Sequence, residues 1–419
     1  MSKLDPDLSI DRNSLTPTAY KFRFRDFLVG AQMLFVAFGA LVLVPILTGL
    51  NPNVALFTSG LGTLCFQLVT GGKIPVYLAS SFAFIAPITL SVDKYGLSAT
   101  MSGLAAAGLV YLVLSLVVFW RGSTIIARIL PTIVTSPVIM VIGLSLAPIA
   151  VEMASEGNEN YSSAIALVIA MVSFLTTVIS AMFVSGFGKL VTILFGIVAG
   201  YLISIPLGLI DFTPIVDAPW LQIPDFVAPS LSLPAILLML PVAIAPAIEH
   251  IGDVLAISSV TKNDYLLDPG IHRTLLGDGL ATTLAAFLGG PPNTTYSEVT
   301  GAVALTKAFN PAIMTWAALI AIALSFLGKL GAILQTIPAP VMGGILIILF
   351  GTIVIVGLNS MMQIADDLLQ PRNLAIASSI LILGVGNINL DLGLFTLEGI
   401  GLSSIVGVLL NLLLPRSRS

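Results

Sequence analysis

Long apolar runs separated by short polar breaks are the feature that most constrains the fold of this chain. A helix that crosses a lipid bilayer needs about 20 consecutive, mostly apolar residues. Runs of about this length recur from residue 27 to the C-terminus, and they predict fourteen spans: 27–49, 53–71, 74–92, 97–120, 124–149, 161–185, 188–210, 233–259, 274–290, 292–309, 311–328, 331–357, 373–388 and 396–414. We therefore expect an all-α polytopic membrane protein.

The composition supports this prediction. Hydrophobic residues make up 57% of the chain and charged residues only 9%, whereas soluble domains carry about 25% charged residues. The net charge of −4 is small, and basic residues cluster only near the N-terminus. Nucleic-acid binding therefore has no electrostatic support, and the lipid bilayer is the expected partner. The single cysteine, Cys65, lies in an apolar run and is expected to be a small buried side chain.

The distribution of lysine and arginine predicts the orientation. With a cytoplasmic N-terminus, only Lys94 and Lys329 of the 17 basic residues fall on the outer side, as the positive-inside rule requires. The outer loop 211–232 carries aspartates and no basic residue. We expect an inner (plasma) membrane protein with two cytoplasmic tails: 1–26, loosely held and without a signal peptide, and 415–419.

Two sequence patterns recur in the same order in both halves. ILPTI at 129–133 returns as ILQTI at 333–337, and GLGT at 60–63 returns as GLAT at 279–282. Each half, 27–210 and 233–414, would hold seven spans, an odd number, so the second would be inverted relative to the first. Inverted repeats are typical of secondary transporters. Chance similarity between apolar stretches is the alternative.

The third and tenth spans are each interrupted by proline near the start and by a polar cluster. Non-helical backbone of this kind is tolerated at membrane depth only where it is buried in protein or lines a water-filled cavity. We expect extended stretches at 74–80 and 291–296 that meet at mid-membrane, followed by half-helices beginning near Ser81-Phe82 and Ser297-Glu298. The first amides of these half-helices would be free to bind a ligand. The alternative is a pair of kinked helices.

Glu249, Asp253 and Glu298 are the clear cases of carboxylates within predicted spans. Ionisable residues there are rare and usually functional, and a spacing of four places Glu249 and Asp253 on one helix face. Without a basic residue at mid-span, this set would repel anions and attract a neutral ligand that alternates N–H and C=O, such as a pyrimidine dione. Burial and like charge disfavour ionisation, so one carboxyl group could carry a coupling proton. The alternative is a set of buried structural carboxylates, above all for Asp253.

The remaining polar candidates have structural interpretations. His250 points away from Glu249 around the helix and favours packing or hydrogen bonding, Asp278 would cap the ninth span or support the site, and His272 lies in a loop. No metal-binding, phosphate-binding or nucleophile motif is present in the sequence. We therefore expect no enzyme activity, no metal and no cofactor.

At these positions the sequence resembles the uracil permeases of the nucleobase–ascorbate transporter family. The resemblance rests on FGALVLVP (38–45), GKIP and SSFAF (72–84), EHIG (249–252), DPGIHR (268–273), PNTTYSE (292–298) and IPAPVMGG (337–344). The family signature Glu/Gln-Asn-x-Gly-x4-Thr takes the form EVTG, ending at Thr306.

The resemblance implies a fold of seven plus seven spans with two short antiparallel strands in spans 3 and 10. It implies a core domain of spans 1–4 and 8–11, a gate domain of spans 5–7 and 12–14, and a homodimer. The implied substrate-binding residues are Glu249, Glu298, Phe82, Ser297, Tyr296, Ser81 and Phe350. Glu249 and Glu298 would hydrogen-bond the base, and the backbone at Phe82 and Ser297 would donate to a carbonyl. Tyr296 would line the pocket, and Phe350 would be an aromatic residue on the gate side.

Three departures bear on function. Met33 replaces a histidine common in the first span, Asp253 stands where the best-known uracil permease has a histidine linked to proton coupling, and Val299 replaces the signature asparagine. An aspartate can still carry a proton, so Asp253, Glu249 and Glu298 are the coupling candidates. The expected function is uracil:proton symport. Xanthine, urate or another nucleobase is the alternative substrate, and a passive channel is the remote alternative.

Overall fold

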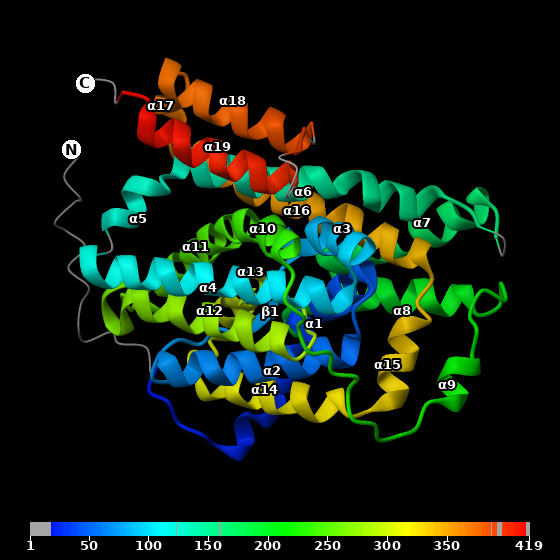
Figure 1. Ribbon diagram of the computed structural model, residues 1–419. Coiled ribbons are helices and arrows are strands. Elements are labelled where there is room, and N and C mark those ends of the chain that lie inside the picture. Colours follow the sequence, from blue (N-terminus) through cyan, green and yellow to red (C-terminus); the bar gives the residue numbers. More distant parts are fainter. Residues whose placement is uncertain (1–17, 123, 159–160, 387, 392–395, 416–419) are drawn as a thin grey trace.

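The computed structural model describes residues 18–122, 124–158, 161–386, 388–391 and 396–415. Figure 1 shows most of the long helices running side by side, with α6, α18 and α19 along one edge and α2 and α14 along the opposite edge. The helices are α1 (Phe27–Thr48), α2 (Pro52–Val69), α3 (Ile85–Tyr95), α4 (Leu97–Arg121), α5 (Thr124–Ile129), α6 (Thr132–Ser155), α7 (Ser163–Phe183), α8 (Thr192–Ser204), α9 (Thr213–Asp217), α10 (Leu233–Val242), α11 (Ile244–Thr261), α12 (Ile271–Phe287), α13 (Ser297–Thr306), α14 (Ala312–Ser325), α15 (Gly328–Gln335), α16 (Ala339–Met362), α17 (Ala365–Leu368), α18 (Pro371–Val385) and α19 (Gly399–Leu413).

Among the described residues, seven helices are long and apolar enough to cross a membrane. They are α1, α2, α4, α6, α7, α16 and the nearly continuous pair α10–α11. Four shorter apolar helices, in the regions of α8, α14, α18 and α19, accompany them. The prediction of a helical protein with many membrane-spanning segments is confirmed.

Three of the predicted spans are divided between separate helices, one of them being 233–259, which holds the nearly continuous pair α10–α11. The run 124–149 contains α5 and most of α6, which meet at Leu130 and Pro131. The run 331–357 overlaps α15 and α16, which meet at 336–338, where Pro338 is the residue before α16. Proline lacks the N–H that a helix needs and restricts the residue before it, so it begins helices more readily than it continues them.

The third and tenth runs each contain a strand and a helix. Strand β1 (Leu78–Ser80) pairs antiparallel with β2 (Asn293–Thr295), with Ala79 opposite Thr294. β1 leads into a 3-10 turn (Phe82–Phe84) and α3, and β2 leads into α13. All six strand residues are buried, so their backbone groups need partners inside the protein.

Side chains from α2 and α12 supply many of those partners. In β1, the Leu78 N–H donates to Thr63 Oγ1 at 3.0 Å, and Ser59 Oγ donates to the Leu78 carbonyl at 2.6 Å. In β2, Thr282 Oγ1 donates to the Asn293 carbonyl at 2.7 Å. These bonds fix the two strands, and with them the starting points of α3 and α13.

The helices form two packed groups. In one, α2 packs on α12 and α14, α4 packs on α10 and α12, and α1 packs on α14. In the other, α16 packs on α6 and α7, α7 packs on α8, and α18 packs on α6 and α19. Contacts of α11 with α6 and α19 join the groups, so α11 lies at their boundary.

Small residues allow the helices of the first group to approach closely. A Cβ atom added at Gly108 of α4 would lie 2.2 Å from Thr283 Oγ1 and 2.8 Å from the Gly279 carbonyl oxygen of α12. Because backbone cannot give way cheaply, we expect Gly108→Ala to lower the free energy of unfolding by about 1–3 kcal/mol, seen as a lower Tm of the purified protein. Gly301→Ala, where a Cβ would meet no atom within 4 Å, is the control. An unchanged Tm in Gly108→Ala would contradict this packing.

Parts of the chain near the termini and between α18 and α19 differ from expectation. Residues 18–26 are not loosely held: Trp316 Nε1 donates to the Arg23 carbonyl at 2.9 Å, and the Tyr20 hydroxyl lies 3.1 Å from Thr315 Oγ1. The rest of the predicted tail, 1–17, and residues 416–419 lie outside the described residues. Strands β3 (Asn389–Asp391) and β4 (Thr396–Glu398) form an antiparallel pair that the hydropathy pattern did not predict.

Candidate functional site

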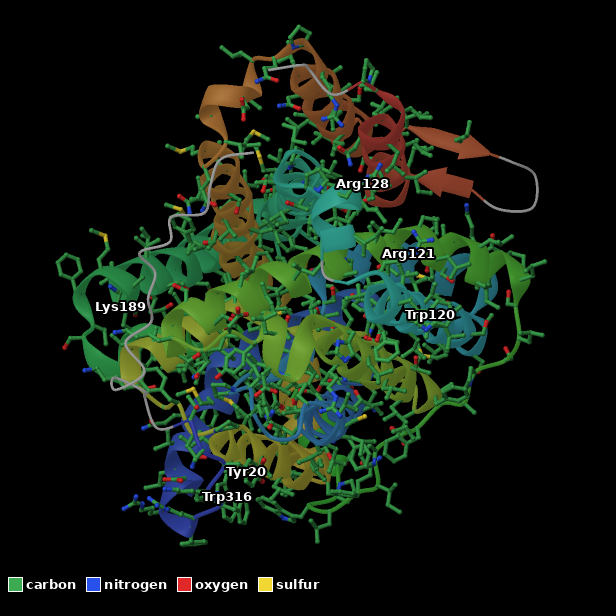
Figure 2. All side chains as sticks on the ribbon, turned by 90° about the vertical axis from the view of Figure 1, so that its left-hand side faces the viewer. Tyr20, Trp120, Arg121, Arg128, Lys189 and Trp316 are labelled. Carbon is green, nitrogen blue, oxygen red and sulfur yellow. The ribbon has the colours of Figure 1, made fainter. Side chains whose placement is uncertain are left out.

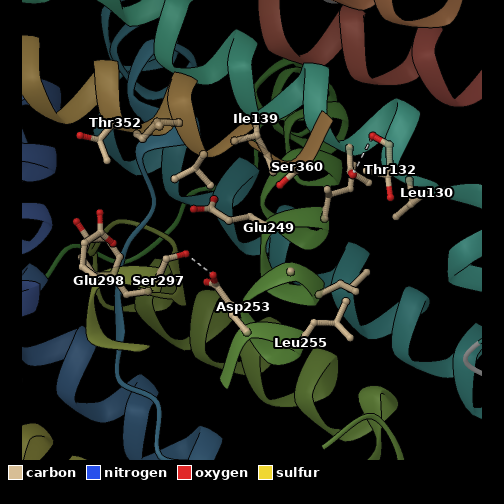
Figure 3. Close-up of a pocket in the computed structure, with 18 of the residues that line it drawn as sticks. Leu130, Thr132, Ile139, Glu249, Asp253, Leu255, Ser297, Glu298, Thr352 and Ser360 are labelled. Atoms are coloured by element: carbon tan, nitrogen blue, oxygen red, sulfur yellow. Dashed lines mark hydrogen bonds between the residues drawn. The ribbon is translucent and has the colours of Figure 1, made fainter. Parts of the chain in front are cut away.

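A cavity of about 510 Å³ lies where the two helix groups face each other. One wall is formed by α11, the residues just before and at the start of α13, and Phe82. The opposite wall is formed by residues at and just before the start of α6 and along α16 (Figure 3). Its lining includes Leu130, Thr132, Ser360 and Gln363. The cavity therefore extends toward the end of the molecule that bears Arg128, the end viewed in Figure 2.

Glu249 and Asp253 lie one turn apart on α11, and both line the cavity. Figure 3 shows the Glu249 side chain above that of Asp253, with Ser297 and Glu298 beside them. The Ser297 hydroxyl donates a hydrogen bond to Asp253 Oδ1. Asp253 Oδ2 is buried and has no hydrogen-bond partner among the described residues.

The start of α13 brings a third carboxylate and backbone donors to the same cavity. Ser297 and Glu298 are the first two residues of this helix, and both line the cavity. First-turn amides have no acceptor within their own helix and are favourable partners for a ligand oxygen. Phe82, which also lines the cavity, is likewise the first residue of its 3-10 turn.

Aromatic rings close one side of the cavity. Phe82 and Tyr296 both line it, with ring centroids 6.3 Å apart. Phe350 of α16 packs edge-on against Phe82 at 6.2 Å but is not part of the lining. It therefore supports the Phe82 ring from the second helix group.

Three other residues singled out from the sequence lie outside the lining. The Ser81 N–H donates to the Pro292 carbonyl at 3.0 Å, which joins the two interrupted segments. Met33 of α1 and Val299 of α13 are both fully buried. None of the three belongs to the cavity wall.

Behind α11 lies a buried polar cluster. His250 Nδ1 is 3.3 Å from Thr295 Oγ1 and 3.4 Å from Asp278 Oδ2, and Thr294 Oγ1 donates to the same Asp278 oxygen at 3.3 Å. His250 and Asp278 are both 0% exposed. The cluster ties α11 and α12 to strand β2 and so fixes Glu249 relative to the start of α13.

The opposite wall holds polar residues that the sequence analysis missed. Thr352 and Ser360 lie on one face of α16, and Thr132 and Thr135 lie in the first turn of α6. Their only signal in the sequence was hydroxyl residues at helical spacing inside apolar runs. Such residues also bond commonly to their own helix, as Thr352 does to the Ile348 carbonyl.

The lining of this cavity combines acceptors and donors without a basic side chain. It contains three carboxylates, several hydroxyl groups and first-turn amides, and no lysine or arginine among its described lining residues. A neutral planar molecule with N–H groups and carbonyl oxygens has the complementary pattern, because carboxylates accept from N–H and amides donate to C=O.

Comparison with known proteins agrees with this architecture. Residues 24–392 match the family model described as "Permease family". A "Probable uracil permease" of Haemophilus influenzae is 53% identical over 95% of this chain and 96% of its own length. The "Uracil permease" of Bacillus subtilis is 42% identical over 92% of each chain, and that of Escherichia coli strain K12 is 37% identical over 91% and 89%.

Solved structures of transporters share the fold. SLC26A9 superposes with a TM-score of 0.70 over 93% of this chain and 64% of its own, at 13% identity. The transmembrane domain of the cyanobacterial bicarbonate transporter BicA gives 0.62 over 94% and 99%, at 15% identity. The sequence relatives are named permeases, which are transporters and not enzymes. With its family match, apolar helices and transporter fold, the chain belongs to the permease family of multi-pass integral membrane proteins.

Proposed function

We propose that this protein imports uracil by proton symport. The observation that carries the proposal is that Glu249 and Glu298, from separate segments, line one cavity together with first-turn amides and no basic side chain. The names of the relatives point to the same substrate. Uracil is small, planar and neutral, and it alternates N–H and C=O groups around its ring.

In the proposed complex, uracil lies between the carboxylates and the Phe82 and Tyr296 rings. Glu249 and Glu298 accept hydrogen bonds from the ring N–H groups, and the amides at Phe82 and Ser297 donate to a carbonyl oxygen. Charge-assisted hydrogen bonds of this kind are about twice as strong as neutral ones. Ser81 and Phe350 contribute indirectly, because they hold the strand junction and the Phe82 ring.

Transport requires that the cavity open alternately to the two sides of the membrane. We propose that α1–α4 and α10–α14 form the core domain, and that α5–α8 and α15–α19 form the gate domain. In full, this is the fold of fourteen spans in two inverted repeats, assembled as a homodimer. The cavity extends toward the basic end of the molecule, so this form would be open to the cytoplasm, with both termini there and the inner membrane as its location.

Proton coupling is assigned to the carboxylates of the cavity. Asp253 is the first candidate, because one of its oxygens accepts from Ser297 and the other is buried without a partner among the described residues. A carboxyl group that takes up a proton from one side and releases it on the other would link uracil movement to the proton gradient. Glu249 and Glu298 are the other candidates.

Uptake competition tests the substrate. In proteoliposomes, radiolabelled uracil uptake should saturate, should fall when a protonophore is added, and should be blocked by excess unlabelled uracil. Excess xanthine should reduce the rate by less than about twofold. Equal competition by xanthine or urate would favour the purine alternative. A flux that does not saturate with uracil would indicate a channel and overturn the proposal.

A further inference from the structure

Residues 18–26, here called the strap, cross the end of the molecule near the α13–α14 turn. Two hydrogen bonds join Asn310 to the backbone of Lys21. The Lys21 N–H donates to Asn310 Oδ1 at 3.1 Å, and Asn310 Nδ2 donates to the Lys21 carbonyl at 2.8 Å. The Tyr20 ring lies directly on Gly72, because a Cβ built there would be only 2.9 Å from the ring. The strap is therefore an ordered part of this surface. Figure 2 labels Tyr20 and Trp316 on this end face.

Between the strap and the α13–α14 turn lies a cavity of about 210 Å³. Four cationic residues line it: Lys21, Arg23, Arg25 and Lys307. The only carboxylate in its lining, Asp26, already accepts from Asn310 at 3.0 Å and lies 3.9 Å from Arg25 Nε. Within the described part of the chain, the other three cations form no salt bridge. The cavity therefore holds an excess of positive charge that an anion could neutralise.

Aromatic side chains beside this cavity place it at the membrane surface. Phe22 stacks on Trp316 with ring centroids 4.5 Å apart, and Phe24 meets the same ring edge-on at 5.8 Å. Phe24 is 79% exposed and Leu28, in the first turn of α1, is 70% exposed. Exposed aromatic residues at the end of a spanning helix are typical of the lipid headgroup region.

We propose that this cavity binds the phosphate group of an anionic phospholipid, with Lys21, Arg23 and Lys307 around the headgroup and Phe24 and Leu28 against the acyl chains. Basic pockets at the membrane surface recognise lipid phosphates through charge and multiple hydrogen bonds. Inorganic phosphate offers the same headgroup chemistry without the chains, so the aromatic residues distinguish the two ligands.

Lipid binding here would stabilise the ends of the helices that form the substrate cavity. α11 and α13 both end at a lysine with a left-handed backbone, Lys262 at φ 55° and Lys307 at φ 56°. The strap lies beside both ends, because Asn263 Nδ2 donates to Thr18 Oγ1 at 3.4 Å and Lys307 lines the cavity next to the strap. A bound headgroup would hold the strap to both helices.

The test compares lipid binding in the intact protein and in the double variant Arg23→Gln/Lys307→Asn. Arg23 bonds to Trp316 through its backbone, so glutamine keeps that bond, and asparagine tolerates the left-handed backbone at 307. We expect phosphatidylglycerol, added to protein in phosphatidylcholine nanodiscs, to raise Tm and to give a retained adduct in native mass spectrometry. The double variant should bind about 30-fold more weakly, because each basic residue contributes roughly fivefold.

Arg121→Gln, which removes an exposed cation at the end of α4 on the same face, is the control and should bind as the wild type does. Two further additions are tested on the wild type alone: phosphatidylcholine and millimolar inorganic phosphate. If either raises Tm as much as phosphatidylglycerol does, recognition of an anionic lipid is overturned. A double variant that keeps the adduct would overturn the assigned site. None of these readouts depends on uracil transport.

Discussion

Glu249→Gln is expected to remove measurable uracil binding. Glutamine keeps the size of the side chain but replaces one acceptor oxygen with an NH2 group, which would face a ring N–H of the ligand. Losing a charge-assisted hydrogen bond and gaining a clash of donors should cost about 3 kcal/mol or more, so Kd should rise at least 100-fold. Isothermal titration of the purified protein with uracil measures this directly.

A matched substitution separates the site from general charge effects. Glu152 lies on α6 and is exposed, away from the cavity lining, so Glu152→Gln should bind uracil as the wild type does. Both variants should keep the wild-type Tm without ligand. Uracil binding by Glu249→Gln within threefold of wild type would contradict the proposed contact.

A helical protein with many membrane-spanning segments could be predicted from hydropathy, because apolar runs near the length of one span recur along the chain. The polar clusters after Pro75 and Pro292 also predicted where helix gives way to extended chain, since proline and hydroxyl residues disfavour a helix interior at these points. The residues at which the helices begin and end were less predictable. Whether Pro131 kinks a helix or begins a new one depends on packing against other helices, which a local pattern does not contain.

The candidate site could be predicted only for residues whose chemistry is unusual in a membrane span. Glu249, Asp253 and Glu298 stand out because a carboxylate in lipid is costly. Thr352 and Ser360 do not, because threonine and serine occur throughout these helices with bonds to their own backbone. The hydrogen bond between Asp253 and Ser297 joins positions 44 residues apart, and it follows from the packing of α11 against β2 and α13, which could not be derived from either segment alone.

The strap shows a third limit on what can be predicted from the sequence. Its basic residues predicted a cytoplasmic end, but its order depends on Asn310 and Trp316, almost 300 residues away. Asparagine and tryptophan near a helix start have many ordinary roles, so the sequence offered no reason to pair them with the N-terminus. Contacts between distant segments through common residue types are visible only in the folded chain.

Asp253→Asn is expected to separate uracil movement from the proton gradient. Asparagine keeps an oxygen that can accept the Ser297 hydroxyl, so the start of α13 should stay in place, but it cannot take up and release a proton. With one proton per uracil, a gradient of one pH unit can drive at most about tenfold accumulation. In proteoliposomes, the wild type should approach this ratio and the variant should stay near one, while uracil exchange persists in both.

Asp93→Asn, exposed on α3, should accumulate uracil normally. Tenfold, protonophore-sensitive accumulation by Asp253→Asn would show that Glu249 or Glu298 carries the proton instead, since either carboxylate shares the same cavity.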